Sequence, residues 1–169
     1  MRSSISAALP IFFLLLSCKQ SVTNSSPLGT FAVYTLLDTT ISTATAIATP
    51  IGDLVLASVP TIRSEDLSAY YWTSHSFVPL PTLDTLLKQM ARLPGKTGGV
   101  PFVVTVGEER IYLGTFWWAY SSSLPTVPSI ELVTPGPYMI ASSPLSSQPD
   151  KRSDPRIRES LRQAGILVD

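Results

Sequence analysis

The sequence is poor in the residues that form covalent cross-links, metal sites and acid–base centres. Its 169 residues include one cysteine, Cys18, and one histidine, His75. A disulfide within the chain needs two cysteines, and a structural zinc site needs four convergent ligands. The acidic residues show no calcium-loop spacing either. We therefore expect no metal, no other cofactor and no disulfide within the chain.

Charged residues are also scarce and balanced. They make up 14% of the chain, with 12 Lys and Arg against 12 Asp and Glu, whereas about 25% is usual. A chain without net charge exerts no long-range attraction on a polyanion, so we expect no nucleic-acid partner. The one basic stretch, residues 151–162, is interleaved with acids, which is typical of a solvated helix face.

No hydrophobic run is long enough to cross a bilayer. The longest is residues 7–16, "AALPIFFLLL", whereas a spanning helix needs about 20 apolar residues. The run follows the basic Arg2 and precedes Ser17 and Cys18. This order of a positive, an apolar and a small-residue region predicts a cleaved signal peptide at residues 1–17.

The residues that end this leader, Leu15-Leu16-Ser17-Cys18, resemble the lipobox of bacterial lipoproteins. The resemblance implies cleavage before Cys18, a thioether-linked lipid on its sulfur, and an acyl chain such as palmitate on the new amino terminus. Several acyl chains hold a protein stably at a membrane, whereas one is marginal. Lys19 in place of aspartate implies the outer membrane if the host has two. The alternative is a plain secreted protein in which Cys18 lies near the cleavage site by chance.

After the leader, the composition changes twice. Residues 18–30 are rich in Ser, Asn, Pro and Gly and are typical of a flexible tether. Residues 31–169 are more apolar and long enough to form one domain with its own core. We therefore expect a lipidated tether that carries a single globular domain.

Within this domain, strand-like patterns outnumber helical ones, which predicts an α+β fold with a mainly antiparallel sheet. Strands are expected at residues 31–37, 39–50, 53–59, 71–80, 130–133 and 138–142, with a hairpin at 100–118. A short helix is expected within residues 63–72. A C-terminal helix is expected within residues 153–165, with Pro155 in its first turn and Gly165 at its end.

A central amphipathic helix is the clearest single element and is expected over residues 82–93. Its apolar residues recur at intervals of three and four: Leu83, Leu86, Leu87, Met90 and Leu93. We expect this stripe to pack on the sheet.

Residues 101–118, "PFVVTVGEERIYLGTFWW", resemble a segment of certain small bacterial lipoproteins of unknown function. The pattern of that family runs roughly PFVV-x-V-x-G-E-R-IYLG-x-FW. Its earlier Y-x-W-x-T-H and later D-x-R-I-x-x-x-L have counterparts at residues 70–75 and 154–161. One departure is that Gly107 precedes two acidic residues. The resemblance implies an envelope lipoprotein and supplies no catalytic residues.

The sequence contains few signals for catalysis. A serine hydrolase would need His75 beside a nucleophile, and no serine lies in a G-x-S-x-G elbow. We expect His75 to lie on a strand in a structural role, with a catalytic or binding role as the alternative. The segment "LPGKTGGV", residues 93–100, lacks the first glycine of a phosphate loop and precedes a strand, so it does not predict nucleotide binding.

Aromatic residues give the best indication of a binding surface. Five of them crowd the second half of the hairpin and its exit: Tyr112, Phe116, Trp117, Trp118 and Tyr120. Neighbours on a strand point to opposite faces, so one tryptophan needs a cover other than the main core. That cover is either a second layer of the fold, which buries both tryptophans, or a protein or glycan partner.

These features predict a lipid-anchored cell-envelope protein whose domain serves in binding or assembly and is not an enzyme. Two alternatives stay open. One is a lipid-anchored hydrolase, which would require polar groups that converge in a pocket around His75 or a pair of carboxylates. The other is an inhibitor of an envelope enzyme, which would expose a loop or strand edge complementary to its target.

Overall fold

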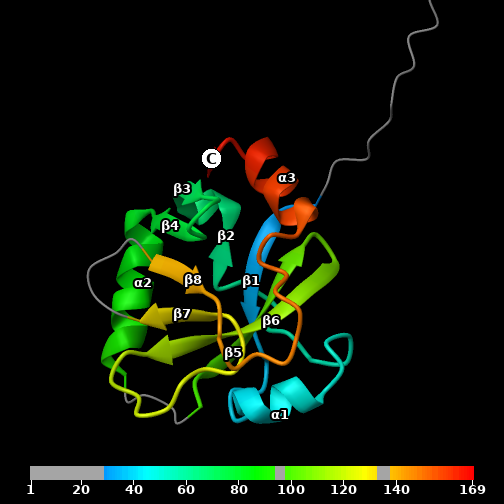
Figure 1. Ribbon diagram of the computed structural model, residues 1–169. Helices are drawn as coiled ribbons and strands as arrows, with labels where there is room; N and C mark the ends of the chain where they lie inside the picture. The colour runs from blue at the N-terminus through cyan, green and yellow to red at the C-terminus, as the bar shows by residue number, and fades with distance from the viewer. Residues whose placement is uncertain (1–28, 94–97, 133–137) are drawn as a thin grey trace, which may run out of the picture.

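The computed structural model describes residues 29–93, 98–132 and 138–169 (Figure 1). The predicted signal peptide and Cys18 lie outside these ranges, as does the tether except for its last two residues. The strands are β1 Phe31–Thr35, β2 Ile62–Arg63, β3 Leu67–Tyr71, β4 Ser76–Pro79, β5 Val100–Val106, β6 Glu109–Trp118, β7 Ser129–Leu132, β8 Tyr138–Ala141 and β9 Leu167–Val168. The helices are α1 Thr43–Ala48, α2 Pro81–Arg92 and α3 Pro155–Gln163, with a 3-10 turn, η1, at Ser64–Asp66.

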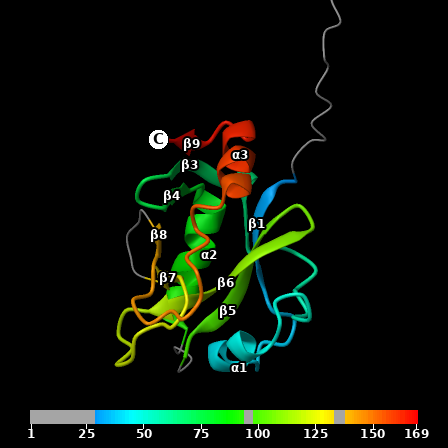
Figure 2. The same ribbon diagram turned by 45° about the vertical axis from the view of Figure 1, so that its right-hand side comes forward.

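The nine strands form one curled sheet, a half-barrel, in the order β2-β1-β5-β6-β7-β8-β4-β3-β9. All neighbouring strands are antiparallel except β6–β7 and β3–β9, which are parallel. Figure 2 shows how β1, β5 and β6 turn away from β7 and β8. The prediction of an α+β fold with a mainly antiparallel sheet, a central helix and a C-terminal helix is confirmed.

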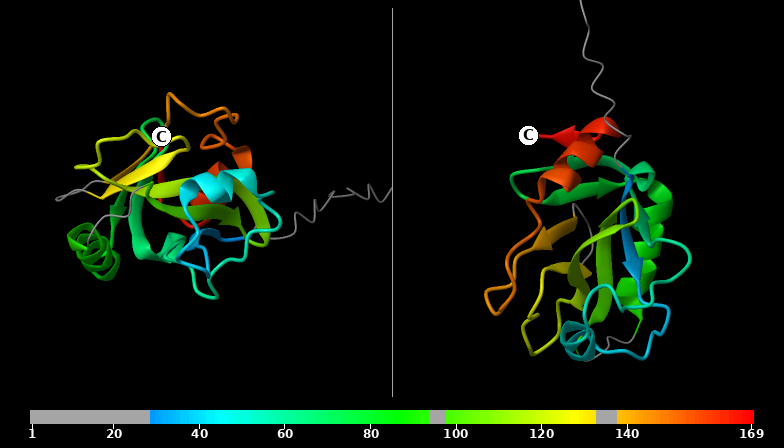
Figure 3. Two further views of the ribbon diagram at one scale, coloured as in Figure 1. Left: turned by 90° about the horizontal axis from the view of Figure 1, so that it is seen from below. Right: turned by 90° about the vertical axis from the view of Figure 1, so that its right-hand side faces the viewer.

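The main core lies between the sheet, α2 and α3. One hydrophobic cluster joins residues of strands β1 to β8 with both helices, and its largest fully buried members include Tyr70, Tyr138, Phe31, Phe77, Phe102 and Phe116. Helix α3 covers β1 and β5 at one end, where the described chain begins, whereas α1 lies at the opposite end (Figure 3). The C-terminal helix therefore docks on the domain.

Two glycines bring the first described residues against the β5–β6 turn. Gly107 has a φ of +59°, a backbone conformation that favours glycine. A Cβ added at Gly29 would lie 2.2 Å from the Cα of Gly107, so no larger residue fits there without movement. The Oγ of Ser160 on α3 also donates a hydrogen bond to the carbonyl of Gly29 at 2.9 Å. These contacts fix where the tether leaves the domain.

A second, smaller hydrophobic cluster lies on the outer face of the sheet. It explains why the strand predicted at residues 39–50 is wrong. This segment contains α1 instead, capped by the Oγ of Ser42, which accepts from the amide of Thr45 at 3.1 Å. Ala46 packs from the helix on Val103 and Leu113 of the hairpin. The β-branched residues of this segment favour a strand, but the serine cap and the packing of Ala46 stabilise a helix instead.

The strand predicted at residues 53–59 is also wrong. Only an isolated bridge between Leu36 and Leu56 remains. The guanidinium of Arg110 on β6 donates from Nη1 to the carbonyls of Ile51, Gly52 and Leu54 at 2.6, 2.9 and 2.7 Å. These contacts hold the chain as a loop up to Leu54, and beyond it only two backbone hydrogen bonds, both of 2.9 Å, join Val55 and Ala57 to the chain of β1.

The region of residues 63–80 differs from both elements expected there. The predicted helix is reduced to η1, after which the chain continues directly as β3. The predicted strand at 71–80 is the end of β3, a turn and β4, which pair as a hairpin. The alternating pattern of residues 71–80 runs through the β3–β4 turn without interruption. The pattern therefore predicted one strand where the chain forms a hairpin.

Helix α2 confirms the central amphipathic helix, but its stripe is narrower than expected. Leu83 and Leu87 are buried, whereas Leu86 is 39% exposed and Leu93 is 59% exposed. Only one edge of the predicted stripe therefore packs on the core. Within the described ranges, no helix combines the length and hydropathy needed to cross a bilayer.

Candidate functional site

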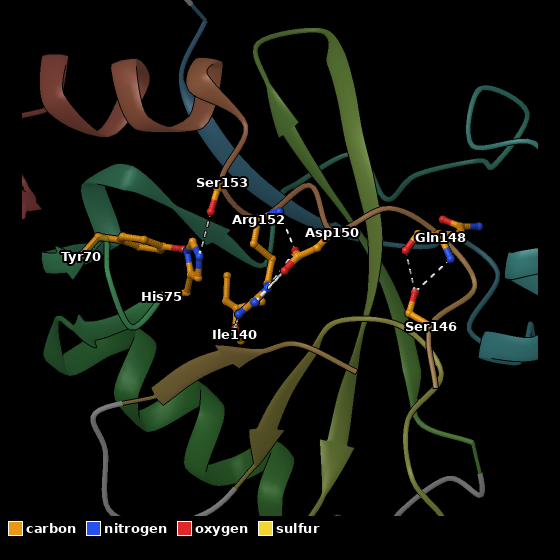
Figure 4. Close-up of polar contacts among 8 residues, drawn as sticks. All are labelled: Tyr70, His75, Ile140, Ser146, Gln148, Asp150, Arg152 and Ser153. Carbon is orange, nitrogen blue, oxygen red and sulfur yellow. Dashed lines mark hydrogen bonds and ion pairs between the residues drawn. The ribbon is translucent and has the colours of Figure 1, made fainter. Parts of the chain in front are cut away.

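His75 lies in the turn between β3 and β4, not within a strand as predicted. Its φ is +50°, and it is the one residue other than glycine with a positive φ in the described part of the chain. A histidine tolerates this left-handed conformation only at some energetic cost. Its side chain is 7% exposed and points beneath the segment that leads into α3 (Figure 4).

Both imidazole nitrogens of His75 have a hydroxyl partner. Nδ1 lies 3.3 Å from the phenol oxygen of Tyr70, and Nε2 lies 3.3 Å from the Oγ of Ser153 (Figure 4). The Trp72 ring also contacts the imidazole edge to face, with centroids 5.4 Å apart. The histidine thus joins the β3–β4 turn to the entrance of α3, 78 residues further along the chain.

The electrostatic surroundings keep this imidazole neutral. Burial lowers the pKa of His75 below its ordinary value of 6.5, and the charge of Arg152 lowers it further, against a smaller opposing effect of Asp150. The Asp150 carboxylate binds Arg152 instead, with contacts of 3.0 Å to Nε and 2.7 Å to Nη2. Arg152 also donates to the carbonyl of Ile140 at 2.8 Å.

This arrangement differs from a catalytic triad in the group that orients the histidine. A triad uses a carboxylate, which stabilises the imidazolium formed when the serine gives up its proton. Here a neutral phenol, Tyr70, occupies that place, and the nearby Arg152 disfavours the imidazolium. The network is therefore suited to holding the segment before α3 in place, and less suited to activating Ser153.

We expect the protein to become less stable as the pH is lowered from about 7, because the free energy of unfolding depends on the protonation of His75. Its pKa is 6.5 when exposed and lower in the folded protein, so between these values the unfolded chain binds more protons. The stabilisation is complete above pH 6.5 and is lost as the pH falls toward the folded pKa. Urea unfolding of the wild type and of His75→Asn, which tolerates the left-handed backbone and does not titrate, measures the difference. The same pH slope in both proteins would contradict a buried neutral histidine.

The aromatic residues proposed as a binding surface are mostly inside the protein. Tyr112 and Trp118 are 5% exposed and Trp117 is 9% exposed, whereas Tyr120 is 68% exposed. Trp118 belongs to the main core, and Trp117 lies on the other face of β6, close to Gly99. Of the two arrangements considered, the structure has the one that buries both tryptophans. An exposed tryptophan is therefore not the basis of a binding surface here.

A groove lies elsewhere, between α2 and the chain segment that leads into η1. It has a volume of about 690 Å³ and is open to solvent. Val59 on one wall is 67% exposed, and Leu86 on the other is 39% exposed. The lining residues are Val59, Pro60, Thr61, Arg63, Asp66, Pro81, Thr82, Leu83, Thr85, Leu86 and Gln89. We call this the α2 groove. The partial exposure of Leu86 could not be read from the sequence, which placed it in the core stripe.

One wall of the α2 groove is an edge of the sheet. Strand β2 stands at one end of the strand order, and just before it the amide of Thr61 donates to the carbonyl of Val33 in β1 at 2.8 Å. The outer side of an edge strand presents backbone donors and acceptors. At this end of the groove, Arg63 contacts two carboxylates, those of Glu65 at 2.6 Å and Asp66 at 3.1 Å. One acidic charge is therefore in excess there.

No protein-family model matches this chain, and no characterised protein or solved structure matches it significantly. The similarity to small envelope lipoproteins therefore stays a prediction. Among the described residues, no group of three or more His, Cys, Asp or Glu side chains is placed to hold a metal ion.

Proposed function

We propose that the protein is a lipoprotein of the cell envelope, anchored by lipid on Cys18, whose domain binds a partner protein. The leader and the lipobox-like residues support the anchor. In a host with two membranes, Lys19 favours the outer one. The α2 groove is the single observation that supports a binding role, because it is open, largely apolar and bordered by a sheet edge.

The partner that best fits this groove is an extended apolar segment that carries a basic residue. A strand added to β2 would gain main-chain hydrogen bonds, and alternate side chains would reach Val59 and Leu86. The excess acidic charge of Glu65 and Asp66 next to Arg63 would attract a lysine or arginine at that end. An inhibitor of an envelope enzyme could use the same edge.

The hydrolase alternative has one supporting observation, the proximity of Ser153 to His75. Three features count against it: the lack of a carboxylate at His75 Nδ1, the repulsion by Arg152, and a histidine only 7% exposed. Binding is therefore the function that the geometry supports better.

We expect short extended peptides selected on the mature domain to alternate apolar residues and to carry one basic residue. Leu86→Asp should weaken their binding at least tenfold, about 1.4 kcal/mol, because a carboxylate replaces an apolar wall. Calorimetric titration of the selected peptides measures this, and amide shifts at Ile62 and Arg63 would locate the added strand.

Val55→Asp is the matched control for this experiment. Val55 is 62% exposed and lies outside the α2 groove, so its variant carries the same charge elsewhere. Equal losses in Leu86→Asp and Val55→Asp would argue against the groove. Selected peptides without a basic residue would argue against the proposed charge preference.

A further inference from the structure

The segment that connects β8 to α3 crosses the outer side of the sheet and is held at several points. We call residues 142–154 the strap. Near its start, the Oγ of Ser143 donates to the carbonyl of Pro125 at 2.6 Å. Near its end, Arg152 binds Asp150 and the carbonyl of Ile140, and Ser153 contacts His75 (Figure 4). These contacts fix the strap in place without filling the space next to it.

A cleft lies between the strap, α1 with its following loop, and β6. Its volume is about 370 Å³, which falls within the range of roughly 300–1,000 Å³ typical of small-molecule sites. Leu54 and Leu113 of the outer hydrophobic cluster are buried in its floor, and the partly buried Ile47 and Ile51 pack beside them. The strap contributes Gln148 and Lys151 to the opposite side. We call this the strap cleft.

One cation that lines the strap cleft, Lys151, stands apart from the ion pairs around it. Among the described residues, no carboxylate lies within ion-pairing distance of Lys151, and Asp154, whose carboxylate feels the charge of Lys151, is bound by Arg156. Arg110, which supports the loop of the cleft, donates to three carbonyls. The two aspartates of the strap, Asp150 and Asp154, are thus each held by an arginine, Arg152 and Arg156.

We infer that the strap cleft binds a small apolar molecule with a carboxylate, of the kind represented by a medium-chain fatty acid. The alkyl chain lies above Leu113 and covers Ile47 and Ile51, two partly exposed apolar side chains that it removes from water. The carboxylate meets the Lys151 ammonium and the Gln148 amide, which are the donors on the strap side. This site is separate from the α2 groove and does not depend on the proposed function of that groove.

The test is calorimetric titration of octanoate into the mature chain, residues 18–169, with Cys18→Ser so that no attached lipid competes. We expect saturable binding of one octanoate. Lys151→Met should weaken it about two- to fivefold, as for an exposed ion pair, and should leave the binding of octanol unchanged. No saturable binding of octanoate, or an unchanged affinity in Lys151→Met, would overturn the inference.

Two tryptophan substitutions on the same helix separate a blocked cleft from a damaged fold. Ala48 lines the strap cleft, whereas Ala44 is an exposed residue of α1 outside it. Ala48→Trp should reduce octanoate affinity at least tenfold, and Ala44→Trp should leave it within twofold, about the scatter expected at an exposed position. Leu86→Asp should also leave octanoate binding intact. Equal affinities of the two tryptophan variants, or loss in Leu86→Asp, would place the ligand elsewhere and refute this site.

Discussion

Replacing Leu87 by aspartate should destabilise the domain by roughly 4 kcal/mol or more, because an unpaired charge would be buried under α2. Leu87 is fully buried and belongs to the main core, together with Leu83. A single domain has only about 5–15 kcal/mol of stability, so this variant should lose a large fraction of it. Leu87→Ala, which leaves a cavity without adding a charge, should cost about 2–5 kcal/mol and remain measurable by urea unfolding.

The adjacent residue provides the control. Leu86 lies on the same helix but is 39% exposed in the α2 groove. Leu86→Asp should therefore cost less than about 1 kcal/mol, close to the value for surface positions. Two aspartate variants with equal unfolding midpoints would show that α2 is not docked as described.

Replacing Cys18 by alanine should abolish lipidation of the protein completely. The sulfur of Cys18 is the only atom in the chain that can form the thioether, and several acyl chains at about 0.8 kcal/mol per buried CH₂ are needed for stable anchoring. Labelling with radioactive fatty acid and the intact mass of the processed protein measure the change. We expect label and added lipid mass in the wild type, and neither in Cys18→Ala.

A second chain is needed because an uncut leader could itself hold Cys18→Ala at the membrane. In this control, residues 19–169 follow an ordinary secretory signal peptide. We expect this chain in the aqueous phase after detergent phase separation, because it lacks Cys18 and with it the proposed site of the lipid. Fatty-acid label in Cys18→Ala, or a free thiol on mature wild-type protein, would refute the lipid anchor.

The sequence predicted well those elements whose signal is local. Pro155, the aspartate before it and Gly165 delimit a C-terminal helix by their own backbone preferences, and α3 begins at Pro155 with Asp154 as its cap. The hairpin of β5 and β6 was likewise evident, since two long β-prone runs flank a glycine turn. In these segments, propensity and tertiary packing favour the same structure.

The predictions failed where contacts distant in sequence decide. Nothing around residues 39–59 shows that Arg110 would bind three carbonyls there or that Val103 and Leu113 would receive α1. The sequence also left open whether the second tryptophan of the aromatic cluster at residues 112–120 is buried or exposed. A tryptophan on the second face of a strand is exposed or buried depending on which distant segment covers it.

The amino-acid sequence by itself determined the fold class, the central helix and the C-terminal helix, because periodicity, caps and glycine turns act within a few residues. Only the tertiary structure decided three features: which side of α2 is exposed, the contact between His75 and Ser153, and the cleft between the strap and β6. The physical reason is that grooves and hydrogen-bond networks form between segments that the chain brings together from far apart. Their chemistry depends on which side chains meet, and a local pattern does not specify that.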